Sequence, residues 1–399
     1  MQLLNSPLSQ VATNSTEQLL DTFQDIANNV QIESEFCVSH PDYKPLGFSR
    51  QVVERFKQMP SEFQNRYLSL QLRSFLYGIY YNGSLRTVLA SDDNSVDLAV
   101  YQNLENNTYL GVNLEFYKRL HESNCGEGYF DSGWFVVRQE CDGSLAVKKG
   151  SLILHIERTC HLQPTQATAT VGDSVAIRMP RNLVQNGFYM AVGNAGSENS
   201  SNLNVRKVRI YFNLSPEGAI AIMSAITRQL NKVGIPFTFK ALYNPSSYGR
   251  YDSAVLYFER SNYEVVRQVV EQVYAENYSH FYAKVPLFTK FLAPGLALAE
   301  EPDHKFAAKE SFGMNRCQIV ANGLLDARAK GDQSPECWMA SILQQFSQLG
   351  IDPSKPYLNA NSQDTYTGLV YENLKLYFTE DRGDKKNFLI LRELATSEC

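Results

Sequence analysis

The sequence predicts an α+β protein with a helical N-terminal region, a domain built on a mixed or antiparallel sheet, and helical additions at the C-terminal end. Two observations lead to this prediction. Apolar residues recur at helical spacing near both ends of the chain and alternate as in strands between them. The elements run in the order helices, strands, a strand–helix–strand–strand–helix unit, and helices. With 399 residues, 44% of them hydrophobic, the chain can form two or three domains with sizeable cores.

Residues 1–125 are predicted to form a mainly helical region. In its first helix, Leu19, Phe23 and Ile26 recur at the spacing of one helix face. A loop that contains proline is expected over 40–47. The predicted helices of this region cover residues 15–30, 49–57, 61–80 and 110–120.

Residues 126–330 are predicted to form the α+β domain. Its most regular unit begins with a strand over 205–214. Ser215 and Pro216 then begin a helix, because serine caps helix N-termini and proline fits the first turn. The predicted strands of this domain cover 134–137, 145–149, 151–157, 174–178, 188–192, 205–214, 236–242 and 254–258, and its helices cover 215–234, 263–278 and 311–329.

Residues 331–399 are expected to form an addition that packs on this domain. A helix is predicted over 335–349, after a turn at 330–332. Two short apolar strands are predicted over 374–378 and 387–391.

Charge and composition exclude several classes of function. The formal net charge is −5 and the isoelectric point is near 5.8, which argues against broad nucleic-acid binding. No stretch approaches about eighteen apolar residues, so we expect no membrane span, and the start of the chain lacks a secretory signal pattern. We therefore expect a cytoplasmic protein, although the Ser/Asn/Gln-rich start leaves type III secretion into a host cell open.

The cysteines indicate a reducing compartment and no metal site. There are seven, an odd number, and no CxxC pair occurs, which is typical of free thiols. Cys160 lies beside His161, with His155 nearby, but no second ligand pair has the spacing of a zinc site.

One face of the predicted strand 205–214 provides the first candidate site. Lys207, Arg209, Tyr211 and Asn213 alternate along the strand and share this face. One interpretation is a solvated outer face. The other is a functional site, because neighbouring like charges are unfavourable unless an anion or a carboxylate elsewhere compensates them.

Lys240 is the second candidate, and two interpretations apply to it. It shares a strand face with Thr238 and Leu242, so it can be a surface lysine whose stem covers apolar residues. It can also be a desolvated amine. Burial and nearby cations such as Arg209 and Lys207 lower a lysine pKa, and a drop of roughly three units from about 10.4 would make it a usable base near neutral pH.

Arg250, Arg316 and their neighbours are candidates for binding phosphate. Arg250 and Asp252 frame the loop after the strand of Lys240, and Arg316 lies in a predicted helix that begins at Ser311. A guanidinium group binds phosphate through two parallel hydrogen bonds, and a helix N-terminus attracts anions. Taken alone, each arginine is better explained as an ordinary salt-bridge partner, whereas together with Lys240 they suggest an anion site.

Other features carry less weight. His155 is better explained as a satisfied core histidine and Lys149 as part of a hairpin rim, although both are kept as supporting candidates, as are Lys207 and Asp252. The pair Glu300-Glu301 is expected to be a solvated helix end. No phosphate-loop, hydrolase or kinase motif is present.

Several ordered blocks of the sequence resemble the HopA-type effector family, which is named after a type III secreted effector of plant-associated bacteria. The blocks are VRIYFNL (208–214), IPFTFKAL (235–242), YGRYDSAVLYF (248–258), VPLFTKFLAPGLALAEEP (285–302) and SFGMNRCQIVANGL (311–324). With a weaker match over 148–196, the similarity covers about 145–330.

The resemblance implies a lyase. Related proteins act in the biosynthesis of class V lanthipeptides and thioamitides, where a separate aminoglycoside-phosphotransferase-like kinase phosphorylates Ser or Thr in a precursor peptide. The HopA-type protein then eliminates phosphate and leaves dehydroalanine or dehydrobutyrine. This reaction requires no metal or organic cofactor.

A more distant similarity to phosphothreonine lyases implies roles for single residues. Lys240 matches the base lysine, and Arg250 and Arg316 match the order of two phosphate-binding arginines, with Arg209 in the first motif. Tyr211 stands where that family has a general-acid histidine. Two functions therefore stay open: a lyase with a tyrosine acid, or a non-enzymatic effector or phosphopeptide-binding subunit that acts with a kinase or a host protein.

Overall fold

The computed structural model confirms the α+β class. It describes residues 7–47, 50–90, 112–197, 206–332 and 334–369. About 43% of the chain is helix and 25% is strand, and neighbouring strands in the described sheets run antiparallel. The strands predicted over 374–378 and 387–391 lie outside the described residues. The domain boundaries predicted after residues 125 and 330 stay predictions.

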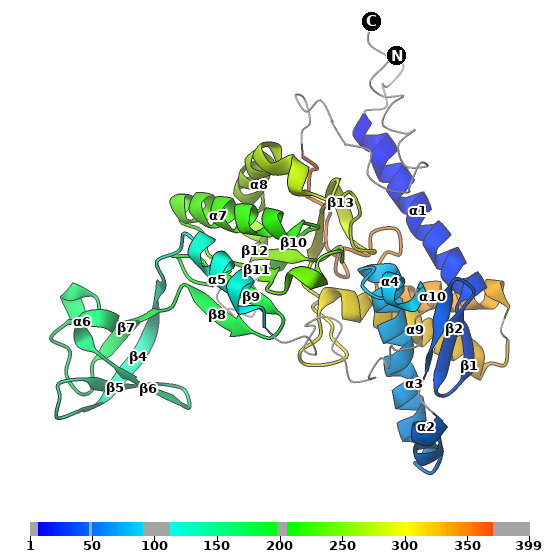
Figure 1. Cartoon of the computed structure of the whole chain (residues 1–399), viewed down its shortest axis with the longest axis horizontal. Helices are drawn as coiled ribbons and strands as arrows, with labels where there is room; N and C mark the ends of the chain where they lie inside the picture. Colours follow the sequence, from blue (N-terminus) through cyan, green and yellow to red (C-terminus); the bar gives the residue numbers. More distant parts are fainter. Residues whose placement is uncertain (1–6, 48–49, 91–111, 198–205, 333, 370–399) are drawn as a thin grey trace, which may run out of the picture. The chain divides into compact units, whose positions relative to one another are not determined.

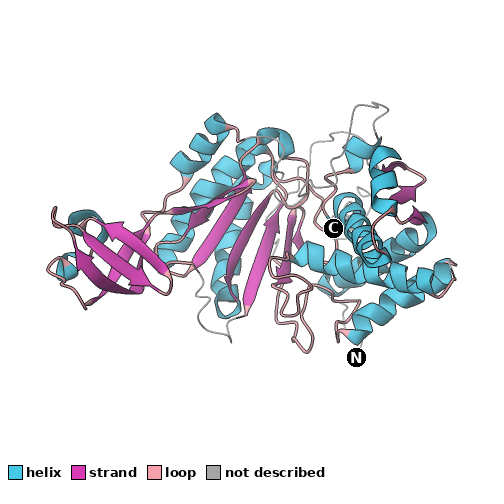
Figure 2. Cartoon of the chain, turned by 90° about the horizontal axis from the view of Figure 1, so that it is seen from below, coloured by secondary structure: helices cyan, strands magenta, loops and turns pink. Residues whose placement is uncertain are grey.

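A seven-stranded sheet is the largest element of the fold (Figures 1 and 2). Its strand order is β13-β14-β10-β12-β11-β9-β8. The bounds are β8 Asn182–Gln185, β9 Phe188–Val192, β10 Lys207–Phe212, β11 Phe237–Leu242, β12 Ala254–Glu259, β13 Lys290–Ala293 and β14 Leu296–Glu300.

Two helices, α7 (Pro216–Val233) and α8 (Tyr263–Asn277), lie side by side over one face of this sheet. The apolar face of β10 points toward them: Phe212 contacts Phe281, which in turn contacts Tyr274 of α8. The capping prediction for α7 is confirmed, since the Ser215 hydroxyl accepts a hydrogen bond from Gly218 N at 3.1 Å. The opposite face of the sheet is left for the polar side chains of β10 and β11.

Several strand regions differ from the prediction. Glu300 does not end a helix: it is the last residue of β14, which forms a hairpin with β13. Every residue of β14 is buried, so its apolar run lacks the alternation that marks a half-buried strand. Residues 40–47, predicted as a loop, include β3 (Tyr43–Gly47), which pairs with β2 (Cys37–His40). β2, β8, β13 and a further strand over 31–34 were also not predicted.

A four-stranded sheet with a core of its own is built from strands that the sequence predicted. Its order is β6-β5-β4-β7. The core gathers Trp134, Val136, Leu145, Val147 and other apolar side chains. The bounds are β4 Tyr129–Gln139, β5 Leu145–Lys149, β6 Leu152–Ile156 and β7 Ser174–Met179. Two short helices, α6 Arg158–His161 and η2 Pro164–Gln166, lie between β6 and β7 in the sequence.

The remaining helices come from both ends of the chain. α9 packs against α3 and α10, and α10 also packs against α1. α3 continues directly into a π-helical turn, η1, whose five residues are all buried. The bounds are α1 Pro7–Asn29, α2 Arg50–Lys57, α3 Ser61–Leu76, η1 Tyr77–Tyr81, α4 Arg86–Ala90, α5 Leu114–Ser123, α9 Phe312–Ala329 and α10 Pro335–Gln348, and β1 (Gln31–Ser34) pairs with β2.

A hydrogen-bonded chain joins α1, η1 and the small sheet of β1 to β3. His40 Nδ1 accepts from Asp42 N at 3.1 Å, so the neutral ring carries its proton on Nε2 and donates it to the Tyr80 hydroxyl at 3.0 Å. Tyr80 in turn donates to Asp25 Oδ2 at 2.9 Å. Burial lowers the pKa of His40, and Arg86 adds to this effect, while Asp25 and Asp42 oppose it.

These hydrogen bonds and the burial of His40 predict that the protein loses stability in mild acid. Because the pKa of His40 is lower in the folded state than its usual value of 6.5, the unfolded chain takes up a proton first as the pH falls. The free energy of unfolding should therefore fall as the pH drops through about 6.5 and level off below the folded pKa. Urea denaturation at about pH 7.5 and about pH 5.5 should show a smaller pH effect for His40→Gln than for the wild type. Equal pH effects would rule out this role of His40.

Candidate functional site

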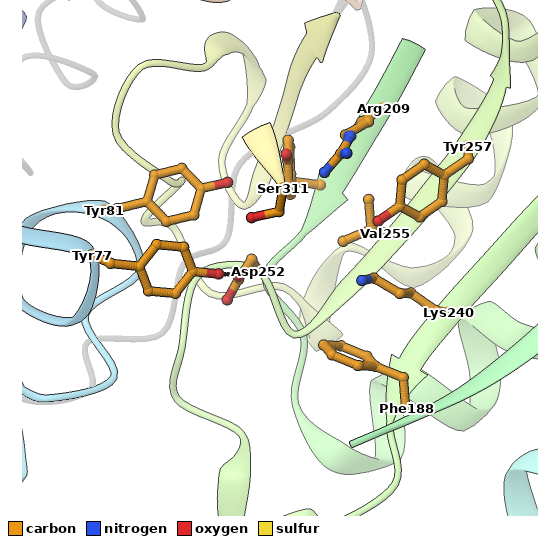
Figure 3. Close-up of a pocket in the computed structure, with 10 residues that line it drawn as sticks. Tyr77, Tyr81, Phe188, Arg209, Lys240, Asp252, Val255, Tyr257 and Ser311 are labelled. Carbon is orange, nitrogen blue, oxygen red and sulfur yellow. Dashed lines mark hydrogen bonds between the residues drawn. The ribbon is translucent and has the colours of Figure 1, made fainter. Parts of the chain in front are cut away.

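A pocket opens on the polar face of the seven-stranded sheet (Figure 3). It holds about 240 Å³ of space free of atoms, its opening to solvent included. β9 to β12, the loop before β12, η1 and the start of α9 all contribute to it. Its lining residues are Tyr77, Tyr81, Phe188, Arg209, Tyr211, Lys240, Asp252, Val255, Tyr257 and Ser311.

The register of three neighbouring strands brings the predicted residues together. Lys240 of β11 and Tyr211 of β10 both lie opposite Val255 of the central strand β12. Arg209 lies opposite Tyr257, one pleat further along. The interpretation of this β10 face as a solvated outer surface is wrong, since Arg209 is 6% exposed and Tyr211 3%.

Cations and aromatic rings alternate along the pocket wall. Lys240 Nζ lies 4.2 Å from the centroid of the Phe188 ring and 5.6 Å from that of Tyr257. The Arg209 guanidinium lies 5.1 Å from the centroid of the Tyr257 ring. The Arg250 guanidinium lies 5.9 Å from the centroid of the Phe188 ring. Ring faces attract cations, so the Phe188 and Tyr257 rings favour the placement of these basic side chains at one wall.

Two carboxylates balance part of this charge. Arg250 makes a bidentate pair with Asp252, at 2.7 Å from Nε to Oδ1 and 2.9 Å from Nη2 to Oδ2. Arg209 pairs with Glu301. Burial raises the pKa of Glu301, but Arg209 and Lys305 outweigh it, so the pKa is lowered and the group is charged at neutral pH. Arg250 therefore reaches the pocket through Asp252.

Hydroxyl groups and the N-terminal cap of α9 also line the pocket. Burial raises the pKa of Tyr211, and Arg209 offsets this only in part, so the phenol is protonated at neutral pH. Its oxygen is buried, and Tyr81 and Arg209 are its polar neighbours. Ser311 caps α9, its hydroxyl accepting from Met314 N at 3.3 Å, so the positive end of this helix lies at the pocket. A tetrahedral anion would find donors on several sides.

Arg316 does not line the pocket. It is 1% exposed and donates to the carbonyl oxygens of Pro356 at 2.7 Å and Leu358 at 3.0 Å, and to Asn315 Oδ1 at 2.6 Å. Burial lowers its pKa to about 10, so it remains charged at neutral pH. In this structure Arg316 ties the segment after α10 to α9.

The supporting candidates lie at varied distances from the pocket. Lys207 begins β10 on the face of Arg209 but does not line the pocket. Lys149 and His155 lie in the four-stranded sheet, outside the pocket. There, Lys149 Nζ contacts Asp131 Oδ1 at 2.7 Å, and His155 Nδ1 lies 3.4 Å from Glu140.

Four aromatic residues of the pocket were not predicted as site residues. Phe188 and Tyr257 lie in predicted strands, and Tyr257 shares its strand face with Val255, so a paired-strand argument could have found it. Tyr77 and Tyr81 come from the run YGIYY at the end of a predicted helix. Nothing local indicates that this run meets strands more than a hundred residues later.

Neither a metal centre nor a membrane span is found in the described part of the chain. Within residues 7–369, gaps excepted, His, Cys, Asp and Glu side chains do not gather in threes at a metal-binding distance. None of the helices described combines the length and the apolar character needed to cross a bilayer.

One family model matches the part of the chain that contains the seven-stranded sheet and α9. Residues 179–358 match the model of the HopA1 effector protein family. Two solved structures are similar to this chain, both effector proteins of Pseudomonas syringae. That from pathovar tomato strain DC3000 has 16% identity over 88% of this chain and 100% of its own, with a TM-score of 0.44. That from pathovar syringae strain 61 has 15% identity over 87% and 99%, with a TM-score of 0.41.

No curated protein matches the sequence. The family match spans the strands β8 to β14, the helices α7 to α10 and most of the pocket, and it leaves out η1. The match of residues 179–358 to the HopA1 effector protein family model agrees with the resemblance that the sequence predicted.

Proposed function

We propose that this protein is a phosphate-eliminating lyase, which converts phosphoserine or phosphothreonine in a peptide to dehydroalanine or dehydrobutyrine. The observation that supports this best is the convergence of Lys240, Arg209 and the capped N-terminus of α9 on one small pocket. Cationic side chains and a helix N-terminus are the usual means of holding a dianion. The substrate would be a precursor peptide phosphorylated by a separate aminoglycoside-phosphotransferase-like kinase.

In the proposed reaction, Arg209 and the first turn of α9 hold the phosphate. Neutral Lys240 removes the Cα proton, the electrons of that C–H bond form the C=C bond, and the Cβ–O bond breaks. Tyr211 donates its proton to the departing oxygen, which leaves with the phosphate. The raised pKa of Tyr211 makes it a weak acid, so it would transfer the proton only as negative charge develops on that oxygen.

Lys240 must be neutral when the substrate binds. Lys240 is only 4% exposed, and its burial favours the neutral amine, as do the nearby Arg209 and Arg250. The carboxylate of Asp252 and the faces of the aromatic rings favour the charged amine. Because Arg250 pairs with Asp252, this carboxylate stabilises the charged form of Lys240 less strongly. This pairing gives Arg250 a role in the site without direct contact to phosphate.

The test is to incubate the full chain with a synthetic phosphothreonine peptide and to weigh the product by mass spectrometry. The proposal predicts loss of the elements of phosphoric acid and release of inorganic phosphate. Intact phosphopeptide, or hydrolysis back to threonine, would contradict it.

A second candidate function is a non-enzymatic effector that binds a phosphorylated host protein. The family match supports an effector role. Two further points favour binding without turnover. Tyr211 stands where the resemblance to phosphothreonine lyases implies a general-acid histidine, and Arg209, Arg250 and Arg316 already have acceptors within the protein. Such an effector would act after type III secretion into a host cell. Binding of the phosphopeptide without any change in its mass would favour this function.

A further inference from the structure

The π-helical turn η1 brings two tyrosines to the pocket from the N-terminal region. The rings of Tyr77 and Tyr81 lie 4.9 Å apart. Figure 3 shows the Tyr77 hydroxyl directed toward Asp252 and the Tyr81 hydroxyl toward Ser311. The bond from Asn82 N to Tyr77 O, at 3.0 Å, closes a π turn, a feature that is frequent at functional sites.

Close packing fixes Tyr81 against the start of α9. A Cβ atom at Gly313 would lie only 2.3 Å from the Tyr81 ring, so the ring rests directly on the first helical turn. The carbonyl oxygen of Tyr81 accepts from Leu287 N at 3.0 Å. On the other side of the turn, Asn82 O accepts from Tyr251 N at 2.9 Å. The position of the Tyr81 hydroxyl is therefore set by the matched family region.

The Tyr81 hydroxyl is a proton donor at neutral pH. Burial raises its pKa, and Tyr211, Tyr77 and Asp252 raise it further. The Tyr211 hydroxyl is a hydrogen-bonding neighbour of the Tyr81 hydroxyl, and both residues line the pocket. Two neutral phenols, those of Tyr81 and Tyr211, thus line the same pocket as Arg209 and the capping residue of α9, Ser311.

We infer that Tyr81 contacts the ligand directly, its hydroxyl donating to an oxygen of the bound phosphate beside Ser311. The binding site is then shared between residues 179–358, which carry the family match, and the helical region that precedes them. The inference rests on the proposed function for the identity of the anion, a phosphate monoester. It assigns a ligand-binding role to a residue outside the matched region.

Isothermal titration of the full chain with a phosphothreonine peptide, and with the same peptide unphosphorylated, tests this contact. Tyr81→Phe keeps the ring packed on Gly313 and removes only the donor. A hydrogen bond to a charged group contributes enough that its loss should weaken phosphopeptide binding by about 10- to 100-fold. Affinity for the unphosphorylated peptide should not change, whereas a purely structural role would change both.

Tyr80→Phe is the matched control, because it removes a hydroxyl of the same turn that points to His40 and Asp25 instead. Its affinity for the phosphopeptide should stay within about twofold of the wild type. Wild-type affinity in Tyr81→Phe would overturn this inference alone. If the wild type binds the phosphopeptide without eliminating phosphate, the lyase proposal is contradicted. The affinity of Tyr81→Phe for the phosphopeptide then still tests the contact of Tyr81. A wild type that does not distinguish the two peptides would overturn both proposals.

Discussion

Replacing Lys240 with alanine should abolish phosphate elimination, lowering its rate by about 10²- to 10⁴-fold, the usual contribution of a positioned base. Lys240 is the amine on the pocket wall formed by β10 to β12, and its Nζ lies against the Phe188 ring. Binding of the phosphopeptide should weaken by less than about tenfold, since Arg209 and the α9 N-terminus still hold the anion. Single-turnover rates followed by mass spectrometry, with titration for affinity, measure the two effects separately.

Lys148→Ala provides the matched control for this experiment. Lys148 is an exposed lysine of β5 in the four-stranded sheet, and it does not line the pocket. Its removal should leave both rate and affinity unchanged. Elimination that persists in Lys240→Ala at the wild-type rate would show that another group removes the proton.

Replacing Glu300 with alanine should reduce the free energy of unfolding by about 3–5 kcal/mol, because it removes the carboxylate at the centre of a buried network of charged and polar groups. Glu300 is 1% exposed, and its carboxylate accepts from the hydroxyls of Ser362 at 2.7 Å and Tyr366 at 2.8 Å, and from Asn359 N at 3.0 Å. Arg260 lies 3.1 Å away. Without the carboxylate, these donors and the guanidinium lose their shared acceptor.

The expected change is measured as a shift in the urea midpoint at constant m-value. Glu264→Ala is the control, since it breaks a surface pair with Arg267 in which the Glu264 side chain is 59% exposed. Exposed pairs contribute about 0–1 kcal/mol, so this variant should remain close to the wild type. Similar losses in the two variants would show that the Glu300 network adds no more than a surface pair.

Local patterns in the sequence were sufficient for much of the fold. The alternation from Lys207 to Asn213 predicted which side chains of β10 share a face. Ser215 and Gly234 predicted the ends of α7, because a capping hydroxyl and a glycine with a φ of 71° are both local requirements. These signals work because each depends on neighbours in the chain.

The rest depends on contacts between distant segments. Glu300 looked solvated, yet it is buried because the segment after α10 covers it with Asn359 and Ser362. Arg316 carries the same charge as Arg209, and only the fold shows that its guanidinium donates to backbone carbonyl groups of the segment after α10. Tyr81 reaches the pocket across a long stretch of sequence, so neither periodicity nor a motif could reveal it.

The central claim, that one pocket holds a phosphate, is tested most directly by a crystal structure of Lys240→Ala bound to a phosphothreonine peptide. This variant should retain the unreacted ligand. The phosphorus should lie in the pocket, with its oxygens within hydrogen-bonding reach of the Arg209 guanidinium and of the first turn of α9 at Ser311. A phosphate bound only elsewhere on the protein, with this pocket empty at saturating peptide, would contradict the account.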